Sequence, residues 1–198
     1  MNPKIDHWYG LKADTFRQYG CFSWTILVKG FIANRTFRPL ITMRLCQLAA
    51  AHRWGGVLLL LAKLLHRWSC NAAGIDFSWK ANIGAGCAIT HGWGLVVSQG
   101  AEIGKNVTLF HGVTLGRRDR ILESGERVTG FPVIEDEVWI GPHAIIVGGV
   151  RVGRGSRIGG GAFVTEHVPP YSVVAGNPSQ IVKANCIPDV FNMAPEKL

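Results

Sequence analysis

With 198 residues, the chain has room for one domain, or for one domain with an appendage. Hydrophobic residues make up 47% and charged residues 17%, which excludes a disordered chain, and the five cysteines are scattered without a C-x-x-C pair, which argues against a disulfide framework and against a zinc finger. The net charge of +8 lies in one segment rather than along the whole chain, and this argues against a protein that binds nucleic acid.

The positive charge is concentrated near the N-terminus. Between Thr15 and Ile75 there is no Asp or Glu, whereas the same segment holds eight Lys and Arg residues. The other 13 basic residues balance the 13 acidic ones, so the rest of the chain is neutral. A neutral body with a cationic, apolar front favours contact with a membrane surface or with an acidic substrate.

Residues 1–20 lack the order of charges and apolar residues that a signal peptide shows. The longest apolar run, residues 57–65, is broken by Lys63, and a membrane-spanning helix needs about 20 apolar residues. We therefore expect a cytoplasmic protein, with peripheral contact to the inner face of the membrane as an open alternative.

The N-terminal segment, residues 1–73, is predicted to be helical. Thr36 fits the N-cap of a helix whose first turn tolerates Pro39, and apolar residues then recur at helical spacing. Gly55 and Gly56 end this helix, and a second one is expected to run to about Ser69. The leucine stripe of the second helix can pack on its own domain, on a neighbouring subunit or on lipid headgroups.

From residue 83 onward, aliphatic residues recur at a spacing of six. Nine of the eleven intervals between successive positions are six residues long, and glycine often follows the aliphatic residue. An α-helix cannot keep one face at six-residue steps, and a strand of period two does not need the glycines. The positions are Ile83, Ile89, Leu95, Ile103, Leu109, Leu115, Ile134, Ile140, Ile146, Val152, Ile158 and Val164.

This spacing predicts a parallel β-solenoid. Each hexapeptide forms one flat side, and three sides close a triangular coil of about 18 residues, with the aliphatic side chain inside and glycine at the tight corners. The solenoid domain is expected over residues 74–183, with the helices covering one end and residues 184–198 as a C-terminal tail. The sequence thus predicts a mainly β fold with an N-terminal helical segment.

Two intervals depart from six residues. Two extra residues stand between Leu95 and Ile103, and the step of 19 residues from Leu115 to Ile134 ejects a polar loop over residues 117–131. Loops on a rigid scaffold often carry recognition, and a tolerated surface insertion is the alternative.

Two histidines occupy equivalent positions in the repeat. His91 and His111 each follow an aliphatic position by two residues and are one coil apart, so we expect one above the other on the outside. Pro142 and Gly160 continue the column, and such small residues above two imidazoles predict a groove for a long, thin ligand. An imidazole titrates near neutral pH and suits proton transfer. A metal site would need a third ligand here, and none is at hand, so no metal is predicted.

Asp76 is the expected partner of this base. It lies 15 residues before His91, just under one coil, and thus about one layer below the imidazole. A neutral imidazole that acts as a base needs an acceptor on its second nitrogen to fix the tautomer, usually a carboxylate. An Asp that only caps the first coil is the alternative.

Five stretches carry a resemblance to a known family. They are Gly74–Asp76, Ile89–Val97, His111–Gly116, Val168–Pro170 and Val174–Pro178. Together they resemble the left-handed β-helix, hexapeptide-repeat acyltransferases, and most of all the branch of serine acetyltransferases and related capsular or exopolysaccharide O-acetyltransferases. The resemblance covers more than half of the chain, and the G-N-P stretch is its most specific part.

The resemblance implies a homotrimer that uses acetyl-CoA, with active sites between subunits. It implies His91 as the catalytic base and Asp76 as its partner, and we expect His111 to hold the acceptor or to assist the departing thiolate. Acetyl-CoA is expected to contact Gly141, Pro142, Gly160, Asn177, Pro178 and Lys183. The acceptor is expected to contact Thr90, Trp93, Arg117, Arg118 and Arg127.

Two departures from the family pattern concern the acceptor. Serine acetyltransferases have an Asp directly before the catalytic His, where this chain has Thr90, and an Arg-His pair before the proline of the loop, where it has Gly130 and Phe131. Charge-assisted hydrogen bonds of this kind are worth about 1.5–3 kcal/mol each. Their absence and the basic loop favour O-acetylation of a sugar in a cell-surface polysaccharide or its precursor. Serine O-acetylation and a non-catalytic β-helix scaffold are the alternatives.

Overall fold

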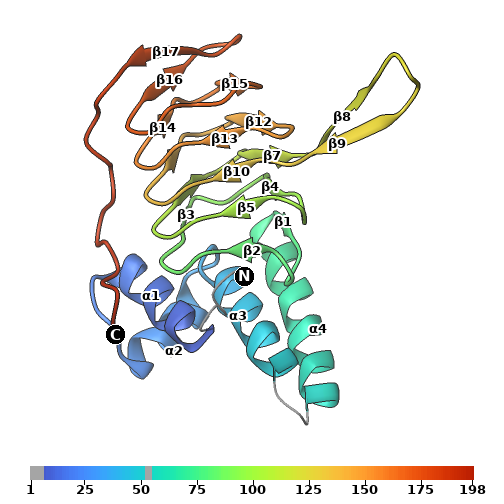
Figure 1. The fold of residues 1–198 in the computed structure, drawn as a ribbon. Coiled ribbons are helices and arrows are strands. Elements are labelled where there is room, and N and C mark those ends of the chain that lie inside the picture. Colours follow the sequence, from blue (N-terminus) through green and yellow to red (C-terminus); the bar gives the residue numbers. More distant parts are fainter. Residues whose placement is uncertain (1–6, 52–54) are drawn as a thin grey trace.

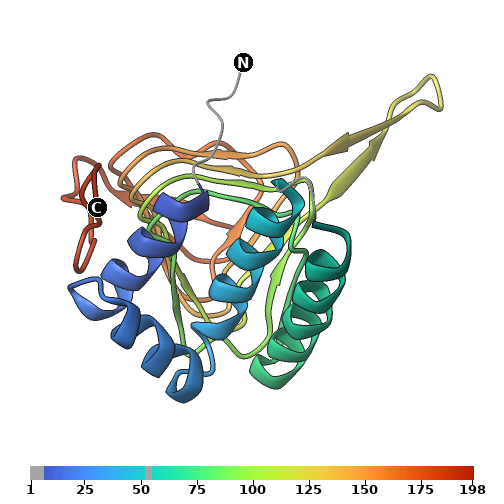
Figure 2. The same cartoon turned by 90° about the horizontal axis from the view of Figure 1, so that it is seen from below.

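The computed structural model describes residues 7–51 and 55–198, and these contain four helices at the N-terminal end (Figure 1). They are α1 (His7–Tyr19), α2 (Trp24–Ala33), α3 (Arg38–Ala51) and α4 (Gly55–Ala73). Seen from below, they cover one end of the β-coils (Figure 2). The helical cap is therefore present as predicted, with α1 and α2 added to the two helices that the sequence pattern indicates.

The start of α3 differs from the expectation. The capping acceptor is Asn34, whose Oδ1 receives the backbone N–H of Thr36 at 3.1 Å and that of Phe37 at 3.2 Å. The hydroxyl of Thr36 donates to the same oxygen at 3.0 Å. Thr36 as the cap is thus wrong by two residues. The end of the first predicted helix, residues 52–54, lies outside the described residues.

The rest of the chain winds into a left-handed parallel β-helix with three faces (Figure 1). The first face contains β1 (Ile75–Phe77), β4 (Leu95–Val97), β7 (Thr114–Gly116), β12 (Ile145–Val147) and β15 (Phe163–Val164). The second contains β2 (Asn82–Ile83), β5 (Glu102–Ile103), β10 (Val133–Ile134) and β13 (Arg151–Val152). The third contains β3 (Ala88–Thr90), β6 (Thr108–Phe110), β11 (Trp139–Ile140), β14 (Arg157–Ile158), β16 (Val173–Ala175) and the antiparallel β17 (Gln180–Lys183).

The aliphatic positions of the repeat form ladders inside the β-helix. On the third face, Ile89 pairs with Leu109, Leu109 with Ile140, and Ile140 with Ile158. None of these four side chains is more than 2% exposed. Full burial of such a side chain contributes about 1.5–3 kcal/mol, so these ladders are a main source of stability. The β-solenoid predicted from the six-residue spacing is confirmed.

The ejected segment is ordered as a hairpin. Strands β8 (Arg118–Ile121) and β9 (Arg127–Gly130) pair in antiparallel fashion and project away from the β-helix (Figures 1 and 2). The sequence predicts a polar loop at this place but not the two strands, because the segment shows no alternation of apolar and polar residues.

A buried ion pair joins the helices to the first coil. Arg44 of α3 donates from Nε to Asp14 of α1 at 2.9 Å, and both side chains are almost fully buried. The guanidinium also donates to the carbonyls of Ile83 at 2.8 Å and Gly84 at 2.7 Å, while Asp14 accepts the backbone N–H of Gly86 at 2.8 Å. The pair therefore fixes α1 and α3 relative to β2.

Helix α4 has one buried and one exposed face. His66 and Ser69 are buried, whereas Val57, Leu61 and Leu64 of the leucine stripe are exposed. The stripe therefore does not pack on its own domain. Within residues 7–51 and 55–198, no helix is both long enough and apolar enough to cross a bilayer.

The C-terminal tail, residues 184–198, returns along the third face to the helices (Figure 1). Arg157 of β14 donates to the carbonyl of Ile187 at 3.1 Å, and further down Asn106 accepts the backbone N–H of Ala194 at 3.1 Å. At the end, Lys12 of α1 donates to the carbonyl of Leu198 at 3.1 Å. The tail thus covers strands of the third face, whereas the sequence did not indicate where the tail would lie.

Candidate active site

The corner between the third and first faces carries the column of residues that the repeat spacing indicates. The register of β3, β6, β11 and β14 puts His91, His111, Pro142 and Gly160 at equivalent positions in successive coils. At about 4.8 Å between parallel strands, this corner column spans about 14 Å. Its lower end is formed by imidazoles and its upper end by small residues.

Three imidazoles stack at the lower end. The ring centroids of His91 and His111 are 5.9 Å apart, and those of His111 and His143 are 4.9 Å apart, both edge to face. A Cβ on Gly112 would lie 2.2 Å from Nδ1 of His143, so only glycine leaves room for this ring. The expectation that only small residues lie above His111 is therefore wrong. The spacing rule misses His143 because it stands one place beyond the repeat position.

The backbone of His91 is held by Arg35, from the segment between α2 and α3. Arg35 donates from Nη2 to the carbonyl of His91 at 3.0 Å and from Nη1 to the carbonyl of Ala73 at 2.9 Å. Its guanidinium lies 3.9 Å from the ring centroid of Trp93, which is 57% exposed. His91 has a φ of +64°, a conformation that residues other than glycine rarely adopt. Arg35 thus clamps a strained corner, and no local sequence signal indicates it.

Asp76 lies on the outer side of β1 and is exposed. It pairs in register with Val96, and the backbone N–H of Gly94 donates to the carbonyl of Gly74 at 2.8 Å. Asp76 therefore belongs to the strand directly below the turn that follows His91. In the described part of the chain, no hydrogen bond joins its carboxylate to the His91 imidazole, so their pairing remains a prediction.

At the upper end of the corner column, glycines allow successive coils to pack closely. A Cβ on Gly141 would lie 2.8 Å from the backbone nitrogen of Gly160. One coil further up, β14 pairs with β16, and the cis peptide bond between Asn177 and Pro178 lies in the turn that follows. Lys183 ends β17 and is exposed. A ligand in contact with all these residues would lie along the corner.

The predicted arginines of the loop lie on the hairpin and differ in their contacts. Arg127 donates to Asp119 at 2.7 Å and Arg117 lies 3.6 Å from the same carboxylate. The hydrogen bonds from Arg127 and Thr129 hold the pKa of Asp119 below its usual value. Two of the three arginines are thus engaged within the hairpin.

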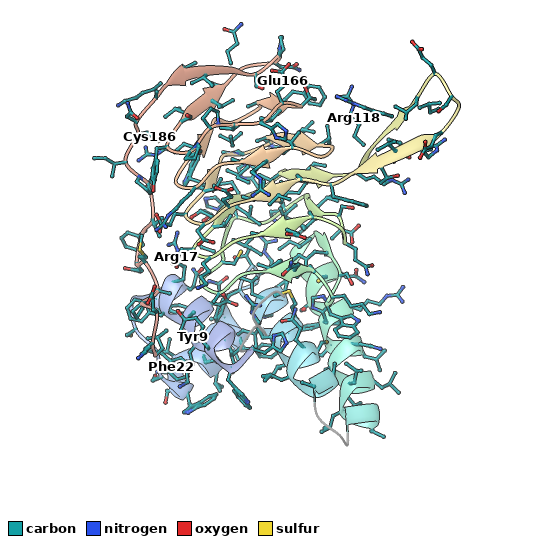
Figure 3. All side chains as sticks on the ribbon, viewed as in Figure 1. Tyr9, Arg17, Phe22, Arg118, Glu166 and Cys186 are labelled. Atoms are coloured by element: carbon teal, nitrogen blue, oxygen red, sulfur yellow. The ribbon has the colours of Figure 1, made fainter. Side chains whose placement is uncertain are left out.

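Arg118 instead lines a cavity of about 610 Å³ between the hairpin and the β-helix, together with Arg120 and Glu166. Figure 3 labels Arg118 and Glu166 on this side of the molecule. Within the described residues, neither Arg118 nor Arg120 forms an ion pair. The cavity lies at the end of the strands of the first face, and the corner column lies at their start.

Thr90 lies on the third face, directly before the corner. It lines a second cavity of about 290 Å³, together with Phe110, Trp139 and Arg17 of α1. The predicted acceptor residues therefore do not form one cluster in a single copy of the chain. Thr90 and Trp93 flank His91, whereas the arginines lie beyond the other edge of the first face.

Comparison with known proteins supports an acetyltransferase. A profile described as bacterial transferase hexapeptide (six repeats) matches residues 131–166. Serine acetyltransferase of Bacillus subtilis (strain 168) is 41% identical over 125 residues, which cover 63% of this chain and 55% of that protein. The chain thus spans about half the length of the curated relatives that it matches.

Two solved structures are similar over most of the chain. Serine acetyltransferase of Brucella abortus strain S19 in complex with coenzyme A is 27% identical with a TM-score of 0.70, covering 90% of this chain and 68% of that one. Soybean serine acetyltransferase complexed with serine is 30% identical with a TM-score of 0.66, covering 89% of this chain and 68% of that one.

These similarities correct the predicted acceptor. The sequence reading favoured a sugar of a cell-surface polysaccharide and likeness to capsular O-acetyltransferases, whereas the relatives and structures named here are serine acetyltransferases. The reading depended partly on free arginines in the loop, but Arg117 and Arg127 are held by Asp119. It also depended on the absence of the two family contacts at Thr90 and at Gly130 and Phe131.

Proposed function

Because this chain belongs to the hexapeptide-repeat, left-handed β-helix acetyltransferases, we propose that it transfers the acetyl group of acetyl-CoA to the hydroxyl of serine. The observation that carries this proposal is that His91 is exposed at the foot of the corner column, which Pro142 and Gly160 continue. The names of the relatives support serine as the acceptor.

His91 acts as the general base. Its imidazole takes the proton from the serine hydroxyl while the oxygen attacks the thioester carbon of acetyl-CoA. The tetrahedral intermediate then collapses, the carbon–sulfur bond breaks, and the imidazolium returns the proton to the departing thiolate. Asp76 orients the ring and stabilises the imidazolium, and His111 contacts the acceptor or the leaving sulfur. The products are O-acetylserine and free CoA.

Acetyl-CoA lies along the corner column, from His91 to the turn at Asn177 and Pro178. Gly160 has no side chain that would stand between a long ligand and the backbone at this position of the column. Arg118 and Arg120 bind phosphate groups, because guanidinium groups without an ion pair suit that ligand.

The functional unit is a homotrimer with active sites between neighbours. In one copy, about five residues of extended chain separate the corner column from the hairpin cavity, a distance of about 16 Å. The two therefore face different sides of the subunit. A site that uses both is completed by the cavity of the adjacent copy.

The test is an assay of the full chain with acetyl-CoA and serine. We expect release of a thiol that depends on serine, together with a product 42 daltons heavier than serine by mass spectrometry. Thiol release at the same rate with and without serine would overturn the proposal, since it would show hydrolysis of the donor and no transfer.

A further inference from the structure

The cavity beside Thr90 is an open pocket formed by elements that are far apart in the sequence. Thr90, Phe110 and Trp139 form its wall on the third face, α1 contributes Arg17, and the tail contributes Asp189 and Phe191. Its volume of about 290 Å³ suits a small molecule rather than a coenzyme. Figure 3 labels Arg17 between the helices and the tail.

Arg17 is a buried cation that lacks an anion. Its side chain is 4% exposed, Nη2 donates to the hydroxyl of Thr108 at 2.7 Å, and Nη1 donates to the carbonyl of Phe191. Nε is buried without a partner, and no ion pair to Arg17 occurs among the described residues. Burial lowers the pKa of Arg17. An unpaired buried charge is costly, and an anion in the cavity would offset that cost.

A carboxylate, that of Asp189, lines the same cavity as Arg17. Asp189 of the tail belongs to its wall, and the field of this carboxylate favours the charged form of Arg17. Asp189 also lies 3.6 Å from Nη1 of Arg157, and its side chain is 52% exposed. The cavity therefore offers a guanidinium and a carboxylate to one small ligand, a pair that matches the two charges of a free amino acid.

The cavity lies next to the predicted base. Thr90 is followed directly by His91, and Phe110, in register with Thr90, is followed by His111. Consecutive Cα atoms are about 3.8 Å apart, so the cavity wall and the imidazole column are neighbours. A small ligand held in the cavity can present a hydroxyl at the corner.

We propose that this cavity binds the acceptor as a zwitterion, with Arg17 on the α-carboxylate and Asp189 on the α-ammonium group. The inference rests on the proposed transfer to serine and specifies how serine is recognised. It also accounts for Thr90, Gly130 and Phe131. The two charges that the resemblance places at those positions come here from α1 and from the tail.

The test compares acceptors that lack one charge each. Arg17→Gln raises the KM for serine by about 10- to 100-fold, the scale of one charge-assisted contact, and leaves the KM for acetyl-CoA unchanged. It also removes the preference for serine over serinamide, which lacks the carboxylate. Asp189→Asn raises the KM for serine but not that for 3-hydroxypropionate, which lacks the amine. Arg151→Gln is the matched control, because this arginine pairs with Glu135 on the second face.

The outcomes separate the cavity from the activity. An unchanged KM for serine in both variants, with transfer intact, overturns the cavity assignment and leaves the proposed function standing. If Arg17→Gln does not fold, Asp189→Asn decides, since its side chain is half exposed. If the native chain does not acetylate serine, saturation-transfer NMR tests whether serine binds to the native protein and to Asp189→Asn. A serine signal that is present with the native protein and lost with the variant supports the cavity assignment. A signal that is equal with both proteins, or absent with both, overturns it.

Discussion

Arg35 and His91 are 56 residues apart in the sequence, yet the guanidinium of one holds the backbone carbonyl of the other at 3.0 Å. The same guanidinium holds the end of α4 through Ala73 and stacks on Trp93. The position of the predicted base is therefore set by the helical cap as well as by the β-helix. We therefore expect a change at Arg35 in the cap to affect turnover.

Replacement of this clamp should lower turnover without weakening binding of the donor. For Arg35→Gln we expect kcat to fall by about 10- to 100-fold, because a small displacement of a catalytic group has effects of this size. The KM for acetyl-CoA should stay unchanged. Arg38→Gln is the control, since Arg38 binds the carbonyl of Phe31 and lies over Trp68 in the same region. Equal losses of kcat in both variants would contradict a specific role for Arg35.

The stack of imidazoles depends on Gly112. This residue has a φ of +68°, and an added Cβ would meet the ring of His143, so Gly112→Ala should lower the melting temperature and reduce turnover. Gly125, in the hairpin turn, has a φ of +80° but open space around it. Gly125→Ala should therefore lower the free energy of unfolding only by the backbone strain, about 1–2 kcal/mol. Similar melting temperatures and equal activity in the two variants would speak against the steric explanation.

Among the described ion pairs, the one between Asp14 and Arg44, which joins the cap to the first coil, should contribute most to the free energy of unfolding. Asp14→Asn leaves Arg44 buried without its anion, and we expect a loss of about 3–5 kcal/mol in the free energy of unfolding. Glu135→Gln breaks an exposed pair with Arg151 and should cost less than about 1 kcal/mol. Urea denaturation followed by circular dichroism measures both. A loss for Asp14→Asn as small as that for Glu135→Gln would show that the buried pair does not stabilise the joint.

The cysteines should differ sharply in reactivity. Burial raises the pKa of Cys46 to about 11 and those of Cys70 and Cys87 to about 12, whereas Cys21 is exposed. At pH 8 a thiol-specific disulfide reagent should modify Cys21 and spare these three, as mass spectrometry of peptides would show. Rapid modification of Cys87 in the folded protein would contradict its burial.

The raised pKa values of these buried thiols also predict that the free energy of unfolding falls at high pH. In the unfolded chain a thiol ionises near pH 8.5, about 3.5 pKa units below the pKa of Cys70 and Cys87 in the folded chain. Their contribution to stability is fully present below this pH and is lost progressively between about pH 9 and pH 12. Replacement of both thiols by alanine should flatten the fall in stability over this range.

The parts of the fold that repeat locally could be predicted from the sequence. Each coil follows from six-residue steps, so the spacing gives the ladder through Leu109 and Ile140 and places His111 above His91. The hairpin is also visible as a break in the spacing. The break in spacing does not predict that β8 pairs with β9, because the register of this hairpin is set by the geometry of its turn and not by a hydrophobic pattern.

The contacts that complete the candidate site are not local, and the sequence could not indicate them. Arg17 reaches Thr108 across 91 residues, and the tail crosses the third face without a pattern of its own. From the sequence alone, an arginine in a helix such as Arg17 is expected on the solvated surface, whereas the structure shows that it is buried. The sequence pattern therefore did not indicate Arg17 as a candidate site residue.

The most direct test of the whole account is the rate of acetyl transfer to serine by His91→Ala under saturating acetyl-CoA. We predict that kcat falls by about 10²–10⁴-fold, the usual effect of losing a positioned acid–base group, while the circular dichroism spectrum stays that of the native chain. A variant that folds normally and keeps the native rate would contradict the assignment of His91 as the base.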